Sequence, residues 1–179
     1  MVLTLPAIAS AFPYHCQRHP MGCSLACFRM LEEWVTGTTL GEDAWRKRLE
    51  GRWSAGAGFP SELVPDALGA ELGSRFSSVE ALHDDALHSL PERFVEGAHA
   101  LLLFVDLWKP RPNGVTNNGH FLLVHGFRRG SVRPLRKDDG ATKAVACFHD
   151  PAVGPDRLVT WESLITPTPH LALLVERNG

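Results

Sequence analysis

The sequence lacks an apolar run of about 18 residues, the length that a membrane-spanning helix requires. It also lacks an excess of positive charge, because the formal net charge at pH 7 is −2. Nucleic-acid-binding domains are generally basic, so this balance argues against DNA or RNA as a partner. We therefore expect no membrane span and no nucleic-acid partner.

Cysteine is scarce and unevenly placed. Three of the four cysteines are Cys16, Cys23 and Cys27, and the fourth, Cys147, is distant. Domains stapled by disulfides carry cysteines spread along the chain, so we expect free thiols and a reducing compartment. Apart from Cys23, we expect these cysteines to be packed. The apolar N-terminus has no basic residues and contains Pro6, so we expect a cytoplasmic protein or an effector exported without a classical signal peptide.

The composition is that of a globular domain, with 44% hydrophobic and 21% charged residues in a chain of 179. Neither an internal repeat nor a linker divides it, so we expect one domain over residues 1–179. Helical periodicity dominates the first half, and continuous apolar runs dominate the second half. This order predicts an α+β fold, in which a helical N-terminal half packs on a C-terminal antiparallel β-sheet.

The apolar pattern also predicts individual elements. Helices are expected over 23–35, 42–49, between Ser61 and Gly73, over 77–90 and over 160–164. The fourth of these opens with Ser77-Ser78-Val79-Glu80, the pattern of a capping box. Strands are expected over 100–108, 119–127, 145–149 and 170–176.

Cys23 is a candidate nucleophile because it begins the first of these helices. The backbone N–H groups and the dipole at a helix N-terminus favour a thiolate over a thiol. Catalysis by a thiolate also needs a base, a group that orients the base, and donors for the oxyanion. His120 heads an apolar strand and suits the base, while Asp150, which ends another strand, suits the orienting group. Gln17 and the backbone N–H of Cys23 would be the oxyanion donors.

The chain resembles the papain-like cysteine peptidases in three places. These are Gln17 with Cys23 at a helix start, the stretch Gly-His-Phe-Leu-Leu-Val-His-Gly-Phe over 119–127, and Asp-Pro-Ala-Val-Gly over 150–154. Within that family it is similar to the bacterial bacteriocin-processing peptidases, which cleave double-glycine leaders. The resemblance implies a papain-like fold, with Cys23, His120, Asp150 and Gln17 in the roles above. It implies a peptide or protein substrate, and no cofactor or metal.

Other functions share this constellation of residues. A glutamine deamidase, or an effector or toxin that transfers an acyl group to an amine, would use the same nucleophile and base. A catalytically inactive relative would bind peptides in the same cleft. The sequence leaves these alternatives, the substrate and the oligomeric state open.

Two rival assignments concern histidines and metal. His125 lies five residues after His120 and should face the opposite side of the strand, and His149 is a third candidate base. A zinc site is the competing chemistry for the N-terminal cluster of His15, Cys16, His19, Cys23 and Cys27. That cluster lacks a Cys-x-x-Cys pair, so we prefer the thiol nucleophile.

Overall fold

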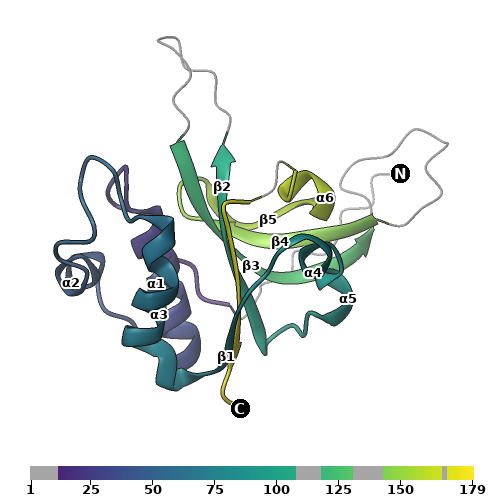
Figure 1. Cartoon of the computed structure of the whole chain (residues 1–179), viewed down its shortest axis with the longest axis horizontal. Coiled ribbons are helices and arrows are strands. Elements are labelled where there is room, and N and C mark those ends of the chain that lie inside the picture. Colours follow the sequence, from purple (N-terminus) through teal and green to yellow (C-terminus); the bar gives the residue numbers. More distant parts are fainter. Residues whose placement is uncertain (1–11, 108–117, 131–142, 167–168) are drawn as a thin grey trace, which may run out of the picture.

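A computed structural model of the chain describes residues 12–107, 118–130, 143–166 and 169–179. Its centre is a six-stranded antiparallel sheet in the order β1-β6-β2-β3-β4-β5 (Figure 1). The strands are β1 (Phe76–Ala81), β2 (His99–Leu107), β3 (Asn118–Gly130), β4 (Lys143–Asp150), β5 (Gly154–Thr160) and β6 (Leu171–Arg177). The α-helices are α1 (Cys23–Thr36), α2 (Glu42–Arg48), α3 (Val64–Leu72), α4 (Asp84–His88), α5 (Leu90–Arg93) and α6 (Trp161–Leu164).

Both faces of the sheet are buried at its centre, and β2 shows this residue by residue. Ala100 and Leu102 pack with side chains of α1, α2 and α3 in one apolar cluster. Leu101, Leu103 and Val105 pack with side chains of α4, α5 and α6 in a second cluster on the other face (Figure 1). A strand that is covered on both sides needs apolar residues at every position, which explains the continuous apolar runs in the sequence.

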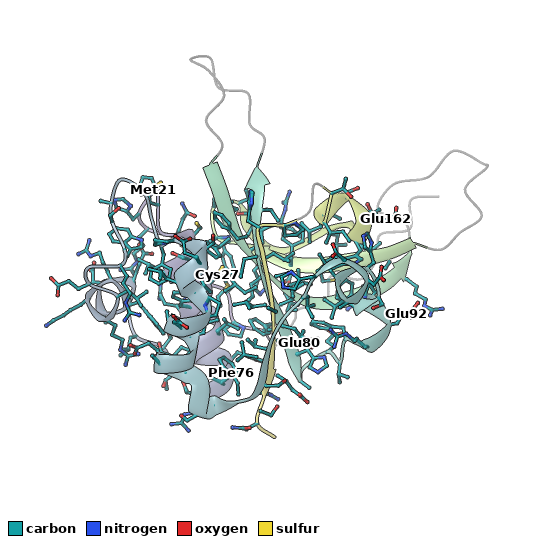
Figure 2. All side chains as sticks on the ribbon, in the orientation of Figure 1. Met21, Cys27, Phe76, Glu80, Glu92 and Glu162 are labelled. Atoms are coloured by element: carbon teal, nitrogen blue, oxygen red, sulfur yellow. The ribbon has the colours of Figure 1, made fainter. Side chains whose placement is uncertain are left out.

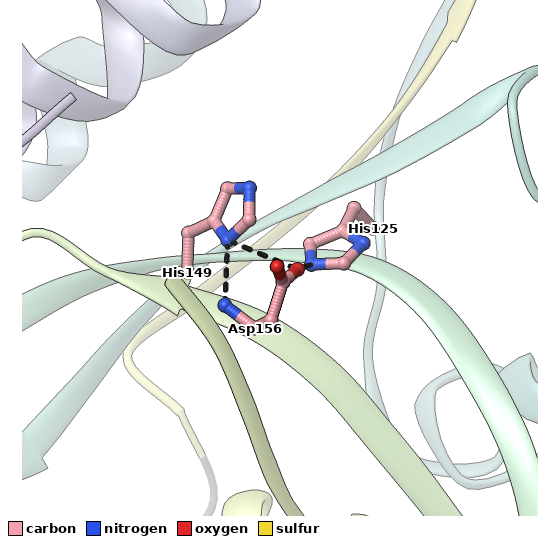
Figure 3. Close-up of side chains that lie close together, drawn as sticks. All are labelled: His125, His149 and Asp156. Carbon is pink, nitrogen blue, oxygen red and sulfur yellow. Dashed lines mark hydrogen bonds and ion pairs between the residues drawn. The ribbon is translucent and has the colours of Figure 1, made fainter. Parts of the chain in front are cut away.

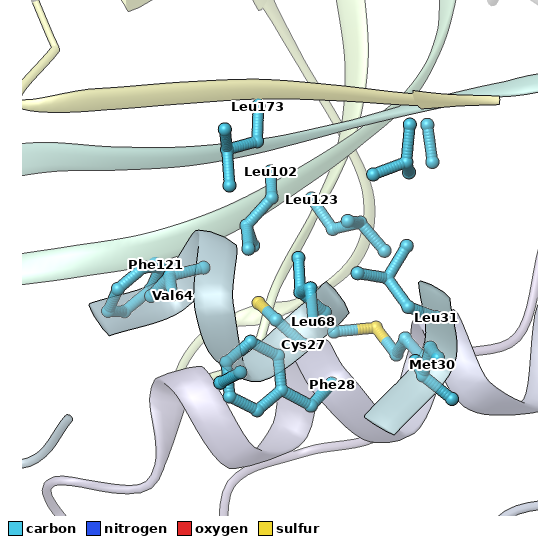
Figure 4. Close-up of a cluster of buried hydrophobic side chains, with 14 of the residues drawn as sticks. Cys27, Phe28, Met30, Leu31, Val64, Leu68, Leu102, Phe121, Leu123 and Leu173 are labelled. Atoms are coloured by element: carbon cyan, nitrogen blue, oxygen red, sulfur yellow. The ribbon is translucent and has the colours of Figure 1, made fainter. Parts of the chain in front are cut away.

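Helix α1 is the main support of the first cluster. Cys27, Met30 and Leu31 are fully buried and point toward the sheet, where they meet Leu102 and Leu123 (Figure 4). Figure 2 shows the same layer filled with side chains around Cys27, whereas Glu92 and Glu162 lie at the surface of the opposite side. The helix therefore cannot rotate or slide without opening the core, and its first residue is held in a defined place.

The helix also ends where the sequence predicts. Gly37 adopts a left-handed φ of 75°, and its N–H donates to the carbonyl oxygen of Glu33 at 2.8 Å. Glycine pays no steric penalty for this conformation, so it commonly terminates helices. The α+β class of the fold is confirmed, as are the predicted helices that correspond to α1, α2, α3 and α6. The strands predicted for the second half are confirmed as β2, β3, β4 and β6, with small differences at their ends.

The helix predicted over 77–90 is wrong. Residues Phe76–Ala81 form β1, an edge strand that pairs with β6, and only short helices follow it. The apparent capping box Ser77–Glu80 is extended, and Ser77 Oγ donates to the carbonyl oxygen of Glu176. Local helix propensity is weak compared with the backbone hydrogen bonds that an exposed strand edge offers. The N-terminal half is therefore not wholly helical, because it contributes one strand to the sheet.

Strand β5 was not predicted from the sequence. Its residues are mostly exposed or half-buried, so no apolar run marks it, and Pro155 argues against a strand. It forms because the turn after Asp150 returns the chain alongside β4, where Cys147 pairs with Leu158. An edge strand with one open side tolerates proline and polar residues in a way that a central strand does not.

Within the described ranges, no helix combines the length and the apolar character needed to cross a lipid bilayer.

All four cysteines are free. Cys27 and Cys147 are buried as predicted, and Cys23 is half-buried. Cys16 is exposed, so the prediction that it is packed is wrong.

Replacement of Leu102 tests the burial of the sheet. Its side chain is 0% exposed, and Leu102→Ala should lower the free energy of unfolding by about 2–5 kcal/mol, through lost apolar contacts and a residual cavity. Urea denaturation measures this loss. Val79 on the edge strand is 40% exposed, and Val79→Ala is the matched control, expected to change stability by about 0.5 kcal/mol or less. Equal losses for both variants would contradict the burial of the face of the sheet that Leu102 occupies.

Candidate active site

The loop before α1 places Cys23 at the N-terminus of the helix. The buried carboxylate of Glu42 on α2 anchors this loop, since its two oxygens accept the backbone N–H groups of Arg18 at 2.8 Å and His19 at 3.1 Å. Gly22 leaves room for the carboxylate, because a Cβ there would lie 2.9 Å from Glu42 Oε1. Hydrogen bonds from backbone N–H groups to a buried carboxylate are strong, so they fix the conformation of the loop that leads into Cys23.

The structure brings Cys23, His120 and Asp150 together. His120 Nε2 donates to Asp150 Oδ1 at 2.8 Å, and the side chain of Cys23 lies close enough to the His120 ring to raise its pKa. Because Asp150 occupies Nε2, Nδ1 is the ring nitrogen left for Cys23. Asp150 is held in turn by the backbone N–H groups of Ala152 at 2.9 Å and Val153 at 3.2 Å. The result is a chain of three side chains with a defined direction.

The charges of this chain follow from its contacts. Burial by itself would lower the pKa of His120, but the hydrogen bond to Asp150, the neighbouring Cys23 side chain and the charges of both partners outweigh it and raise the pKa to about 9. Burial would raise the pKa of Asp150, and the hydrogen bond and positive charge of His120, with the two backbone donors, lower it instead. At neutral pH the pair is an imidazolium and a carboxylate.

Gln17 lies in the anchored loop, beside the turn that follows Asp150. Its backbone N–H donates to the carbonyl oxygen of Pro151 at 3.0 Å. Its side-chain Nε2 donates to the carbonyl oxygens of His19 at 3.2 Å and Pro20 at 3.0 Å. In this conformation the side-chain amide N–H groups of Gln17 are hydrogen-bonded within the loop. The role of Gln17 as an oxyanion donor stays a prediction, and it requires one of these two hydrogen bonds to be exchanged.

A cavity of about 270 Å³ opens beside Cys23. One wall is the glycine-rich segment 56–59, and the other includes Phe104, Gly119 and Phe121 from β2 and β3. Gly119 is needed here because the ring of Phe104 lies over it, and a Cβ at this position would fall 1.9 Å from Phe104 Cζ. Both groups of residues line the same cavity as Cys23, so a ligand in this cavity would lie beside the sulfur.

The rival bases lie elsewhere. The His125 ring is 4.3 Å from the His149 ring between centroids, and both contact Asp156 rather than Cys23. Burial, the neighbouring His149 and the charge of Arg128 together lower the pKa of His125 to about 3. Burial also lowers the pKa of His149, partly offset by its hydrogen bond to Phe12 and by the charge of Asp156. At neutral pH both of these imidazoles are therefore uncharged, whereas that of His120 is positively charged.

The structure does not assemble the alternative zinc cluster among the residues that it describes. His15 Nε2 lies 2.7 Å from Glu33 Oε2, and His19 Nδ1 accepts the backbone N–H of Met21 at 3.1 Å. Cys16 is exposed, whereas Cys27 is fully buried one turn into α1. The residues of that cluster are engaged in different places, so proximity in sequence did not become proximity in space.

Sequence reasoning missed Glu42 and Asp156. Glu42 appeared as an ordinary charged residue in the first turn of a helix, and no local pattern shows that its carboxylate receives backbone donors from residues 18 and 19. Asp156 lies in a strand that was not predicted. One signal was present: an acidic residue close after Pro155 in a polar segment is typical of a turn or strand end, where side chains are often aimed at a site.

The pairing of His120 with Asp150 gives a titration that can be measured. His120 should keep its proton up to about pH 9, and its NMR ring signals should titrate there and not near the unperturbed value of about 6.5. Asp150→Asn should lower the midpoint, because the variant loses the strongest interaction that raises it. A wild-type midpoint near 6.5 would contradict the arrangement. By linkage, the stability that His120 protonation contributes is fully present below about pH 6.5 and is lost as the pH rises through about 9.

Comparisons with known proteins add no family to this geometry. No protein-family model matches the chain, and no curated protein matches its sequence. The contacts of Cys23, His120 and Asp150 are therefore the basis for a functional hypothesis.

Proposed function

We propose that the protein is a papain-like cysteine peptidase or amidohydrolase that acts on a peptide or protein substrate through Cys23, His120 and Asp150. The observation that carries this proposal is the grouping of Cys23, at a helix start, with His120 and Asp150, on two strands. His120 is hydrogen-bonded to Asp150, and Cys23 lies close enough to His120 to raise the pKa of its ring. A nucleophile next to a base, with the base oriented by a third group, is the signature of covalent acyl transfer.

The charge state of His120 supports the first step. Its raised pKa of about 9 keeps a positive charge beside the Cys23 sulfur at neutral pH, and such a neighbour stabilises a thiolate. The thiolate attacks the carbonyl carbon of the scissile amide, and a negative charge develops on the carbonyl oxygen. No described side chain caps the first turn of α1, so the backbone N–H of Cys23 can donate to this oxygen. Gln17 would be the second donor.

The second step uses the proton on His120. The imidazolium donates this proton to the nitrogen of the leaving amine as the C–N bond breaks, and a thioester with Cys23 remains. His120, now neutral, accepts a proton from a water molecule that attacks the thioester, and the carboxylic acid and the thiolate are released. Asp150 keeps the ring oriented throughout and stabilises its positive charge.

Hydrolysis is the outcome that this proposal assigns, and the cavity beside Cys23 supports a peptide as the substrate. Residues 56–58 and Phe104 line this cavity together with Cys23, so an extended peptide bound there would bring an amide bond next to the sulfur.

Selective alkylation tests the proposed nucleophile inside a single chain. Limiting iodoacetamide at pH 7, with mass-spectrometric mapping, should modify Cys23 about tenfold faster than Cys16, because an ordinary cysteine is only a few per cent thiolate at this pH. Cys16 is the internal control. It is exposed whereas Cys23 is half-buried, so faster labelling of Cys23 cannot be explained by better access to the reagent. Cys27 and Cys147, which are buried and have raised pKa values, should be protected.

Variants separate activation from access. His120→Ala should lower the labelling rate of Cys23 to that of Cys16 or below, and circular dichroism should show that the fold is retained. With a mixture of peptides as substrate, Cys23→Ser and His120→Ala should abolish cleavage, whereas Cys16→Ser should not. If Cys23 reacts no faster than Cys16 and His120→Ala has no effect, the catalytic proposal is wrong and a peptide-binding role remains.

A further inference from the structure

A second group of side chains lies outside the proposed active site, where β3, β4 and β5 run side by side. It consists of His125, His149 and Asp156, one residue from each strand (Figure 3). One nitrogen or oxygen atom from each residue lies within 4.8 Å of those of the other two. The proposed catalytic mechanism uses none of these three side chains, so the cluster requires its own explanation.

The imidazole of His125 is left unsatisfied. This residue is only 4% exposed, and neither ring nitrogen makes a hydrogen bond to any described residue. Its Nε2 is 3.3 Å from Asp156 Oδ1, but without the alignment of a hydrogen bond. A buried polar group without a partner costs about 1–3 kcal/mol, and such groups are rare in folded proteins. A ligand that binds between the two residues would remove this cost.

His149 is already oriented as a metal ligand would be. Its Nε2 lies 3.2 Å from the carbonyl oxygen of Phe12, which can only accept, so Nε2 carries the proton. Nδ1 therefore holds the lone pair, and it lies 3.8 Å from Asp156 Oδ1. Histidines that bind metals typically donate the other ring N–H to a carbonyl or a carboxylate in this way. At present Nδ1 accepts the backbone N–H of Asp156 at 3.1 Å.

Irregularities in the sheet direct these side chains to one point. The β3–β4 register shifts between Val124 and Gly126, where His125 is the extra residue. The β4–β5 register shifts between Phe148 and Asp150, where His149 lies. Asp156 has a left-handed φ of 49°, which is unusual for a residue with a side chain. Bulges and strained residues of this kind re-aim side chains and are concentrated at functional sites.

We propose that His125 Nε2, His149 Nδ1 and Asp156 Oδ1 bind one divalent transition-metal ion of the zinc class. Zinc held tetrahedrally at about 2.0–2.1 Å keeps its ligand atoms about 3.3 Å apart. The two separations involving Asp156 Oδ1 are 3.3 and 3.8 Å, and no pair of ligand atoms is more than 4.8 Å apart, so rotations of the side chains would close the site. Two imidazoles and one carboxylate suit Zn²⁺, Co²⁺ or Ni²⁺ rather than the all-oxygen sites of Ca²⁺ or Mg²⁺.

The surroundings accept the charge of such an ion. The side chain of Asp156 is 42% exposed, which gives the ion a route from solvent and leaves the fourth position to water. Arg128 is the nearby positive charge, and the carboxylate of Glu96 lies 4.0 Å from its Nη2. Binding exchanges the hydrogen bond from the Asp156 N–H to His149 Nδ1 for a coordination bond. It also ties β5 to β3 and β4 next to Asp150.

The experiment uses the full chain after chelation and dialysis. Titration with Zn²⁺ in a calorimeter should show one saturable site, and Zn²⁺ should raise the melting temperature. Co²⁺ in place of Zn²⁺ should give the visible d–d bands of a tetrahedral site without a thiolate charge-transfer band. That second feature separates this site from any ion held by Cys23 or the other cysteines, and Cys23→Ser should bind Zn²⁺ like the wild type.

Asp156→Asn is the decisive variant. Asparagine tolerates the left-handed conformation at least as well as aspartate, so the fold should be kept while the carboxylate ligand is lost. The affinity for Zn²⁺ should fall at least about tenfold, the low end of what loss of even an outer-shell partner costs. His125→Ala should also abolish Zn²⁺ binding, in a variant whose circular dichroism spectrum matches that of the wild type. No saturable binding by the wild type, an unchanged affinity in Asp156→Asn, or a thiolate band with Co²⁺ would each overturn the proposal.

Discussion

The antiparallel pairing of β3 with β4 is the constraint on which both sites depend. In this ladder Leu123 lies opposite His149, which brings Asp150 within hydrogen-bonding distance of His120. Side chains alternate between the two faces of a strand, so a slip of one residue would turn every side chain of one strand to the wrong face. Such a slip would turn His120 away from Asp150 and His125 away from His149. The register of this pair therefore sets the geometry of the polar groups.

Burial acts on several histidines of this sheet, but the partners decide the charge of each. His120 is buried beside the carboxylate of Asp150, and its pKa rises to about 9. His125 is buried beside a second imidazole and a guanidinium, and its pKa falls to about 3. Desolvation lowers the pKa in both cases, but in His120 the hydrogen bond to Asp150 and the neighbouring negative charges outweigh it, whereas in His125 the neighbouring positive charges add to it. One strand thus carries a charged histidine suited to proton transfer and a neutral one suited to metal coordination.

The sequence could nominate the candidate nucleophile and its partners because each has a local signature. Cys23 begins an amphipathic helix, His120 heads an apolar strand, and Asp150 ends another. Glu42 has no such signature, since its role depends on backbone N–H groups that lie more than twenty residues earlier. The prediction of a helix over 77–90 was wrong for a related reason. Strand β1 is stabilised by pairing with β6, about a hundred residues later in the chain, and not by its own periodicity.

By itself, the sequence determined the α+β class, the position of α1 and the central strands, because periodicity and apolar runs record which residues must be buried. Only the tertiary structure decided which polar groups meet. It placed Cys23 close to His120 and Asp150, separated the N-terminal cysteines and histidines that were the alternative zinc ligands, and brought His125, His149 and Asp156 together. Such contacts depend on strand register, bulges and one strained φ, which are properties of the whole sheet and not of any local stretch.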